Sequence, residues 1–177
     1  MAYQLAEITG GLARDPAGFV AECDQSYQRR LNAAADRILE RMKESPIVLL
    51  SGPSGSGKTT TALKLEQELE RRGVQTHTIS MDNYFKTMNR KTAPRNAEGD
   101  IDYESPQLLD MDLLDETFTK LSRGEWVVVP KFEFARQMRN DSRGTLLKLG
   151  KDEIAIFEGI HALNDDIAGR HPEATTL

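Results

Sequence analysis

The chain has 177 residues, of which 38% are hydrophobic and 29% charged, and its formal net charge is −5. This length and composition indicate one folded domain with a hydrophobic core, and they exclude an intrinsically disordered chain. The acidic balance argues against a nucleic-acid-binding surface, and the longest apolar runs are too short to cross a membrane.

The cysteine content and the first residues bear on the compartment. Cys23 is the only cysteine, which excludes an intrachain disulfide and fits a reducing environment. The N-terminus lacks the basic stretch and apolar run of a secretory signal. We therefore expect a cytoplasmic protein with a buried, structural Cys23, and with neither a membrane nor a nucleic acid as partner.

The first third of the chain predicts a long helix. Residues 1–14 carry no clear pattern, and we expect them to be loose. Asp15 and Pro16 form a helix start, with an N-cap followed by a proline at the first helical position. Apolar side chains then recur at helical spacing to about residue 44. They are Val20, Cys23, Tyr27, Leu31, Ala34, Ile38 and Met42.

These signals divide the chain into an N-terminal helical extension, residues 1–45, and a core, residues 46–177. The core begins with an apolar run at 46–51, which is typical of a strand buried on both faces. A glycine-rich turn, a helix at 58–72 and a second strand at 74–80 follow. The order strand, helix, strand predicts a parallel α/β sheet with a right-handed crossover. The sequence leaves open whether the N-terminal helix packs on this core or on a partner subunit.

The remaining elements are less regular. Residues 82–104 are polar and predict a long mobile loop. A helix is expected from Ser105 to just before Gly124, and strands are expected at 126–132 and 153–157. Residues 145–149 could pair back as a hairpin. The helix should turn four apolar side chains inward, namely Met111, Leu114, Phe118 and Leu121.

The strongest motif is a P-loop between the first strand and its helix. Residues 52–60 (GPSGSGKTT) satisfy the pattern G-x-x-x-x-G-K-[ST], in the strand–helix context that the pattern requires. Its backbone N–H groups and helix N-terminus would hold the phosphates of ATP or GTP, Lys58 would reach the β- and γ-phosphates, and Thr59 would ligate Mg²⁺. The expected nucleotide-binding residues are Gly52, Ser54, Gly55, Ser56, Gly57, Lys58, Thr59 and Thr60.

Carboxylates follow two of the predicted strands. Asp82 comes after the strand at 74–80, and Glu158 ends the strand at 153–157. In open α/β sheets, ligands bind at the carboxyl ends of strands, so both should face the γ-phosphate. We expect Asp82 to act as the catalytic base beside Lys58, and Glu158 to join Thr59 at the metal. The alternatives are a turn-capping Asp82 and an ordinary strand-end Glu158.

The P-loop, residues 82–85 (DNYF) and residues 157–160 (FEGI) resemble the uridine kinase branch of the phosphoribulokinase and uridine kinase superfamily. The resemblance runs from about residue 46 to 165. It implies a P-loop NTPase-type parallel sheet with helices on both faces, and phosphoryl transfer to a nucleoside hydroxyl. Tyr84, in the aromatic pair after Asp82, would then contact the acceptor.

Residues 102–110 and 130–134 extend the resemblance. They imply that Glu104, or its neighbour Asp102, contacts the ribose, and that Phe132 and Phe134 flank the base. Core packing of one phenylalanine, and a purely dipolar role for the acidic pair near a helix N-terminus, are the alternatives. Gln137 stands where the family has a base-reading His, and Arg139 could contact phosphate or hold the loop.

Family members continue beyond this point with further strands and an arginine-rich lid, so we expect the C-terminal part of the usual fold to be missing. The resemblance implies a kinase that uses ATP or GTP with Mg²⁺, takes uridine or cytidine, and is often a homo-oligomer. Pantothenate, glycerate or a sugar phosphate as acceptor, and a non-catalytic nucleotide-binding module, are the alternatives. A nucleic-acid-dependent ATPase is disfavoured by the acidic balance.

Overall fold

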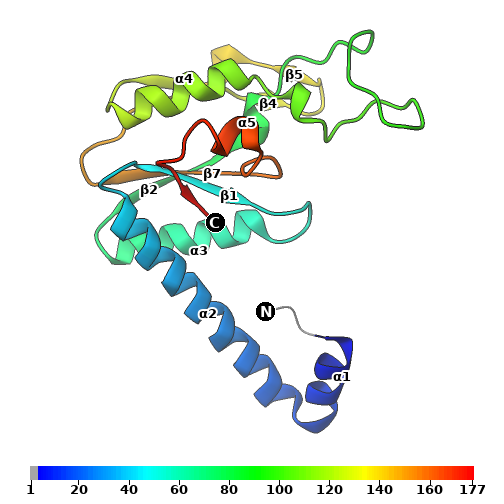
Figure 1. Ribbon diagram of the computed structural model, residues 1–177, viewed down its shortest axis with the longest axis vertical. Coiled ribbons are helices and arrows are strands. Elements are labelled where there is room, and N and C mark those ends of the chain that lie inside the picture. The colour runs from blue at the N-terminus through cyan, green and yellow to red at the C-terminus, as the bar shows by residue number, and fades with distance from the viewer. Residues whose placement is uncertain (1–3) are drawn as a thin grey trace.

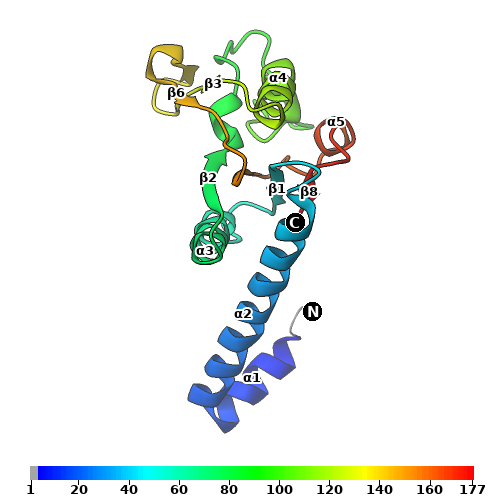
Figure 2. The same ribbon diagram turned by 90° about the vertical axis from the view of Figure 1, so that its left-hand side faces the viewer.

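A parallel sheet forms the centre of the protein. The computed structural model describes residues 4–177, and within them four strands pair in the order β2-β7-β1-β8. The strands are β1 (Ile47–Ser51), β2 (Gln75–Ser80), β7 (Glu153–Gly159) and β8 (Thr175–Thr176). Helices cover both faces of this sheet, as Figure 2 shows. The predicted fold class, a parallel α/β sheet between helices, is confirmed.

The strand order explains how distant segments meet. The helix α3 (Lys58–Arg71) connects β1 to β2 as expected, but β7 lies between these two strands. In the register, Glu158 of β7 is the partner of Leu50 on one side and of Ser80 on the other. The carboxyl ends of the central strands therefore lie together, where the P-loop leaves β1.

Each face of the sheet has its own hydrophobic core. Leu49 and Phe157 contribute to the core under α4 (Met111–Ser122) and the short α5 (Asp165–Ala168). Their chain neighbours Val48 and Ile156 point to the opposite face and join the core under α3 and α2 (Pro16–Arg41). This alternation follows from the period of two in a strand, and it makes β1 and β7 apolar on both faces.

The N-terminal helices project from the core as an arm, which Figure 1 shows in blue. Asp15 caps α2 as predicted, because its carboxylate accepts a hydrogen bond from the Gly18 amide at 3.0 Å. Leu31 and Ile38 are buried against the sheet, whereas Val20 is 52% exposed on the arm. Cys23 is half-buried rather than buried as expected, since it lies on the projecting half of α2.

The expectation that residues 1–14 are loose is wrong for residues 5–14, which form the helix α1 (Leu5–Arg14), whereas residues 1–3 lie outside the described residues. Glu7 stabilises the start of α1, because the backbone N–H of Gln4 donates to the Glu7 carboxylate at 2.7 Å. Within residues 4–177, no helix is both long and apolar enough to span a bilayer.

The segment between β2 and β7 is organised differently from the prediction. The helix expected from Ser105 begins at Met111, because Ser105 caps only a 3₁₀ turn, η2 (Pro106–Leu108), and Asp110 caps α4. The strand expected at 126–132 is split into β3 (Val127–Val129) and β4 (Phe132–Glu133) around Pro130, which has no N–H to donate.

Short ribbons complete this segment. β6 (Thr145–Leu147) pairs antiparallel with β3, which confirms the predicted hairpin, and β5 (Met138–Arg139) pairs with β4. A 3₁₀ turn, η3 (Asp141–Arg143), lies between β5 and β6. Residues 86–104 form a protruding loop, closed at its base by a bridge between Phe85 and Leu109.

Candidate functional site

The P-loop connects β1 to α3 in a conformation suited to an anion. Gly55 and Gly57 have positive φ angles of 72° and 85°, which other residues adopt only with strain. These turns bring the chain to the N-terminus of α3 at Lys58, where unpaired amide groups and the helix dipole favour negative charge. The loop can therefore bind phosphate through its backbone.

The side chains of the P-loop engage local partners. Lys58 Nζ donates to the carbonyl oxygen of Pro53 at 2.9 Å, so the lysine lies back over the loop. Thr59 Oγ1 donates to Glu158 Oε1 at 3.3 Å, and Glu158 is only 7% exposed. A hydroxyl and a carboxylate at the end of a phosphate-binding loop are the hard oxygen ligands that Mg²⁺ prefers.

Among residues 4–177, no cluster of three or more His, Cys, Asp or Glu side chains is placed to hold a metal ion. The pair formed by Thr59 and Glu158 still fits Mg²⁺, because this ion is usually held by one or two protein oxygens together with phosphate and water.

A cleft of about 400 Å³ connects these groups to Asp82. Asp82 lies in the 3₁₀ turn η1 (Met81–Tyr84), directly after β2. Burial raises the pKa of the Asp82 carboxyl, and the positive charges of Lys58 and His161 act in the opposite direction. The cleft is lined by Ser54, Gly55, Gly57, Lys58, Thr59, Thr60, Asp82, Glu158, Gly159 and Ile160.

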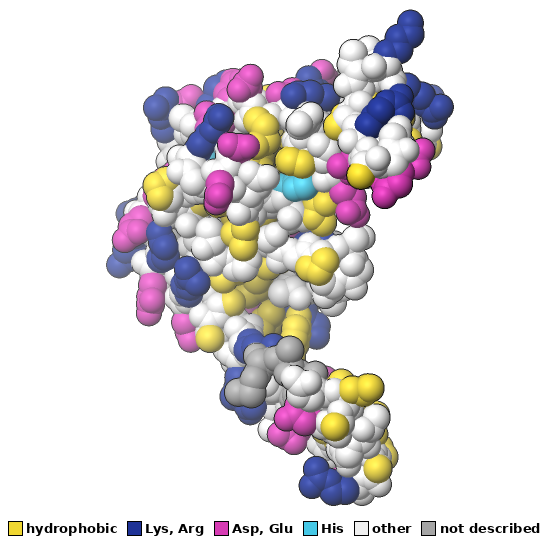
Figure 3. Space-filling model, turned by 45° about the vertical axis from the view of Figure 1, so that its right-hand side comes forward, with side chains coloured by type: hydrophobic (Ala, Val, Ile, Leu, Met, Phe, Trp, Pro, Cys, Tyr) yellow, Lys and Arg dark blue, Asp and Glu magenta, His cyan; other side chains and the backbone are white. Residues whose placement is uncertain are grey.

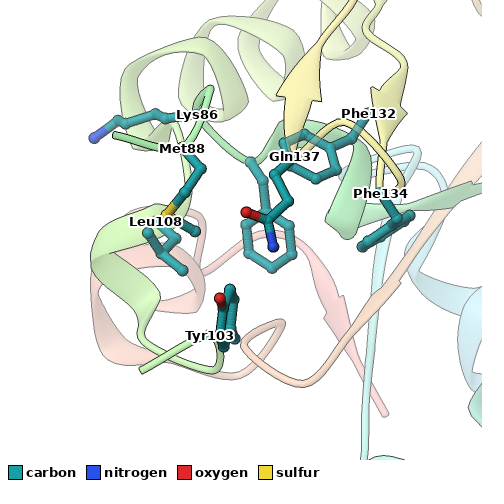
Figure 4. A pocket seen from close by; sticks show the side chains of 8 residues that line it. Lys86, Met88, Tyr103, Leu108, Phe132, Phe134 and Gln137 are labelled. Atoms are coloured by element: carbon teal, nitrogen blue, oxygen red, sulfur yellow. The ribbon is translucent and has the colours of Figure 1, made fainter. Parts of the chain in front are cut away.

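A second cavity, of about 120 Å³, lies beyond the other end of η1 and is mostly apolar. The Phe85 and Phe132 rings meet edge to face with centroids 5.6 Å apart, and Phe134 packs on Phe132 at 5.1 Å. Figure 4 shows the amide of Gln137 pointing into this space, toward Tyr103. The remaining lining residues are Lys86, Met88 and Leu108.

The two cavities share one structural connection. The Asn83 side chain accepts a hydrogen bond from the Phe132 amide at 3.2 Å, which attaches η1 to the hairpin of β4 and β5. Asp82 therefore borders the phosphate cleft, and Phe85, three residues later, borders the aromatic cavity. The turn η1 thus links the cleft beside the P-loop to the aromatic cavity.

Comparison with known proteins matches this arrangement to one family. The description "Phosphoribulokinase / Uridine kinase family" applies to residues 47–171, most of the chain. The chain belongs to this family.

This chain matches only part of the length of individual family members. A uridine kinase of Schizosaccharomyces pombe is 34% identical over 66% of this chain and 25% of its own length. A uridine kinase of Staphylococcus aureus strain JH9 is 32% identical over 71% of this chain and 58% of its own. The chain thus spans between a quarter and about three fifths of these curated relatives.

A solved structure shares the fold. A Silicibacter sp. TM1040 chain, described as a kinase of a fructose transport system, superposes with a TM-score of 0.58 at 26% identity. The match covers 73% of the present chain and 62% of the other. The fold of the chain is therefore that of the P-loop kinases, while its relatives carry different descriptions.

The structure corrects some positions expected from the family pattern. Tyr84 is 0% exposed and packs in the core near Phe157, so it does not reach a ligand. In a 3₁₀ turn the residues that follow Asp82 point in different directions, and Phe85 reaches the aromatic cavity instead. Glu104 is exposed and lines neither cavity, whereas its neighbour Tyr103 lines the aromatic one.

Arg139 lies near the aromatic cavity but is held by carboxylates. Its guanidinium contacts Asp110 at 2.6 Å and Asp141 at 2.9 Å, and these contacts raise the pKa of Arg139. Since Asp110 caps α4, the ion pair joins the β5 hairpin to that helix. Of the two expected roles, this geometry favours holding the loop over contacting phosphate.

Sequence reasoning missed His161 and Tyr103. His161 follows the family segment 157–160 by one residue, so its place after a central strand was a usable signal. Tyr103 lies in the polar loop, where no periodicity indicates which side chains turn inward. Phe132, Phe134 and Gln137 all line the aromatic cavity, and their contact with a base stays a prediction.

Proposed function

We propose that this chain is the core of a nucleoside kinase, which transfers the γ-phosphoryl group of ATP or GTP to the 5′-hydroxyl of uridine or cytidine. The observation that carries the proposal is the turn from Asp82 to Phe85, which borders the phosphate cleft at one end and the aromatic cavity at the other. A hydroxyl attached to a flat base in that cavity would meet the carboxylate beside the P-loop.

The donor would be held by the P-loop. Its amides bind the phosphates, and Lys58 leaves the Pro53 carbonyl to contact the β- and γ-phosphates. Thr59 and Glu158 would hold Mg²⁺, directly or through water, and the ion would neutralise charge on the transferring group.

Asp82 would act on the acceptor. As the acceptor oxygen forms its bond to the γ-phosphorus, its proton passes to the Asp82 carboxylate, and the bond to the bridging oxygen breaks with its electron pair on the departing diphosphate. Burial favours this step, because a carboxylate whose pKa is raised is a stronger base. Lys58 would stabilise the negative charge that develops on the phosphates, and Thr59 and Glu158 would hold the ion that supplies further positive charge there.

Selectivity for a base would reside in the aromatic cavity. Phe132 and Phe134 offer faces for a flat ring, and the Gln137 amide can both donate to and accept from its polar edge. Gln137 adopts a left-handed backbone with φ of 51°, and its carbonyl accepts from the Met88 amide at 2.9 Å. This conformation fixes the amide in the cavity at a cost of about 1–2 kcal/mol.

Other functions remain as alternatives with their own observations. The first alternative is a kinase of another alcohol, such as a sugar phosphate, glycerate or pantothenate. The similarity to the Silicibacter chain, described as a kinase of a fructose transport system, supports this alternative. A non-catalytic nucleotide-binding module is the alternative from another class, and the projecting arm of α1 and α2 would be its partner-binding element.

The test is nucleoside-dependent ADP release from ATP and Mg²⁺. We expect uridine or cytidine to stimulate release, and Asp82→Asn to lower kcat by roughly 10²- to 10⁴-fold, the usual size of a general-base contribution. Asp152→Asn, an exposed carboxylate before β7, is the matched control. Gln137→Ala should raise KM for the nucleoside and leave KM for ATP unchanged.

The alternatives predict different results in the same assay. Stimulation by a sugar or an acid, and not by a nucleoside, would transfer the proposal to that acceptor. ATP binding without any acceptor-dependent ADP would contradict the kinase and favour the binding module.

A further inference from the structure

His161 lies beside the proposed catalytic base because of the sheet register. Ser80 of β2 pairs with Glu158 of β7, so the residues that follow these strands leave the sheet at the same point. Asp82 comes two residues after Ser80, and His161 comes three residues after Glu158. Their proximity is expressed in the charges, since His161 is one of the groups that act on the pKa of Asp82.

The imidazole and the carboxylate both lack partners. His161 Nε2 is buried from solvent and has no hydrogen-bond partner among residues 4–177. The Asp82 carboxylate likewise accepts no hydrogen bond from any residue in this range, although three groups with charge or ligand capacity lie around it: Lys58 of α3, Glu158 of β7 and His161. A buried polar group without a hydrogen-bond partner destabilises the fold.

The nearby donors differ in what they are already doing. Lys58 Nζ donates to Pro53, and in the proposed reaction it moves to the phosphates. Glu158 is engaged by Thr59 and is itself an acceptor. Of these three groups, His161 is therefore the one with an unused ring nitrogen that can donate to Asp82 while nucleotide is bound.

We propose that His161 is a positioning residue for the phosphoryl-transfer reaction, which donates from Nε2 to the Asp82 carboxylate in the substrate-bound state. This inference rests on the proposed function. The hydrogen bond would use one carboxylate oxygen and direct the other at the acceptor hydroxyl. It would also keep Asp82 ionised at neutral pH, against the burial that favours its protonated form.

The test compares His161→Ala with His161→Gln in the ADP-release assay across pH. The Gln side chain can place an N–H near the position of Nε2 but carries no charge. We expect His161→Ala to lower kcat by about ten- to a hundredfold, the scale of a misplaced reacting group, with KM for ATP unchanged and the acidic limb of the profile moved to higher pH. His161→Gln should recover most of kcat at neutral pH.

The controls separate a positioning role from a structural one. His77→Gln alters a histidine of β2 that pairs with Glu153, and it should leave kcat and the pH profile unchanged. An unchanged kcat and profile in His161→Ala would overturn the inference, and so would a rise in KM for ATP without a change in kcat. If His161→Ala does not fold, failure of His161→Gln to retain more than a hundredth of kcat would overturn it.

A readout without turnover distinguishes this inference from the proposed function. The carboxyl of Asp82 can be titrated by NMR in the metal-free complex of the chain with ATP, and its pKa should be higher in His161→Gln than in the wild type. If the wild type shows no nucleoside-dependent ADP but this shift is present, the proposed function fails and the pairing of His161 with Asp82 stands. If turnover is present and the shift is absent, the pairing fails.

Discussion

At the scale of single residues, Asp82 illustrates a conflict between stability and reactivity. Burial raises the pKa of its carboxyl, and the nearby charges of Lys58 and His161 only partly oppose this effect. The ionised form that a base needs is therefore the form that the folded state tolerates less well. A position of this kind is typical of functional sites, where proteins give up some stability for chemistry.

This conflict predicts that Asp82→Asn stabilises the fold while it impairs the reaction. Because the folded-state pKa of Asp82 is raised, its contribution to stability is complete below the unfolded-state pKa and is lost as pH rises through the folded-state pKa. Asn resembles the protonated carboxyl and does not ionise. The Tm of Asp82→Asn should therefore exceed that of the wild type at neutral pH.

Thermal unfolding followed by circular dichroism measures this difference. The gain in Tm should shrink as the pH is lowered through the carboxyl range, since the wild-type carboxyl then becomes neutral as well. A lower Tm for Asp82→Asn at neutral pH would show that the ionised carboxylate stabilises the fold, contrary to the direction of its pKa.

The sequence placed those residues that belong to a motif of fixed spacing or that directly follow a predicted strand. Lys58 and Thr59 follow from the P-loop pattern, and Asp82 follows from its place after a strand. Tyr84 and Glu104 were misplaced because the turn and loop around them have no fixed side-chain period. The local backbone, rather than the residue type, decides that Phe85 and Tyr103 face the cavity.

At the scale of elements, an ion-pair cluster joins α2 to α3, which cover the same face of the sheet. Glu68 is 9% exposed and accepts hydrogen bonds from Arg71 at 2.7 Å and from Arg72 at 2.7 Å. Arg72 also contacts Asp36 of α2. The hydrogen bonds from Arg71 and Arg72 lower the pKa of Glu68 to about 2. The cluster fixes the helix that starts with the P-loop against the base of the arm.

The lowered pKa predicts an acid-sensitive contribution to stability. A carboxyl whose folded-state pKa is depressed stabilises the fold above its unfolded-state pKa, and this contribution is lost as pH falls toward the folded-state value. Glu68→Gln should therefore lower Tm by a few degrees at neutral pH, and the difference from wild type should disappear in strong acid. Glu70→Gln, an exposed neighbour on α3, is the control and should have no effect.

Element boundaries were predictable where a cap and a periodic face agreed. The start of α2 after its cap Asp15 and the end of the helix expected at 58–72 meet both conditions, and Gly73, with a φ of 87°, supplies the left-handed residue that ends α3. Ser105 and Asp110 both carry N-cap signals five residues apart, and only packing of the apolar face of α4 selects Asp110. Helix α1 carries Leu5, Ile8 and Leu12 at helical spacing, so its sequence contained a usable signal.

At the scale of the whole molecule, the protruding loop, the core and the arm follow one another along the long axis. Figure 3 shows the protruding loop of residues 86–104 at one end and the arm at the other, with apolar side chains gathered where the arm meets the core. The phosphate cleft lies at the carboxyl edge of the sheet, between helices that pack on opposite faces. Ligand binding there should therefore stabilise the core more than the arm.

We predict that Mg²⁺ and ATP raise Tm through the P-loop. At a concentration of about a hundred times Kd, binding contributes about 2.7 kcal/mol, which is about 5–10 °C for a domain of this size. Lys58→Ala should lose most of this shift. Lys151→Ala, an exposed lysine at the opposite end of β7, should keep it, and an equal shift in both variants would contradict the proposed donor site.

The architecture of the whole molecule was predictable only in class. A strand–helix–strand pattern indicates a parallel sheet, but the insertion of β7 between β1 and β2 depends on contacts between segments far apart in the chain. The boundary expected at residue 45 likewise depends on contacts between distant segments. Leu31 and Ile38 before it share a core with Val48 after it.

The central position of β7 has a consequence for synthesis on the ribosome. Ile47 of β1 pairs with Ala155 of β7, so the partner of the first strand is translated long after it. At about 5–20 residues per second, β1 and the P-loop wait roughly 5–20 s for that partner. During this interval the apolar faces of β1 and the unpaired N–H and C=O groups along its edges are open to chaperones and to other nascent chains. The cleft itself is incomplete until Glu158 and Gly159, which line it, have left the exit tunnel.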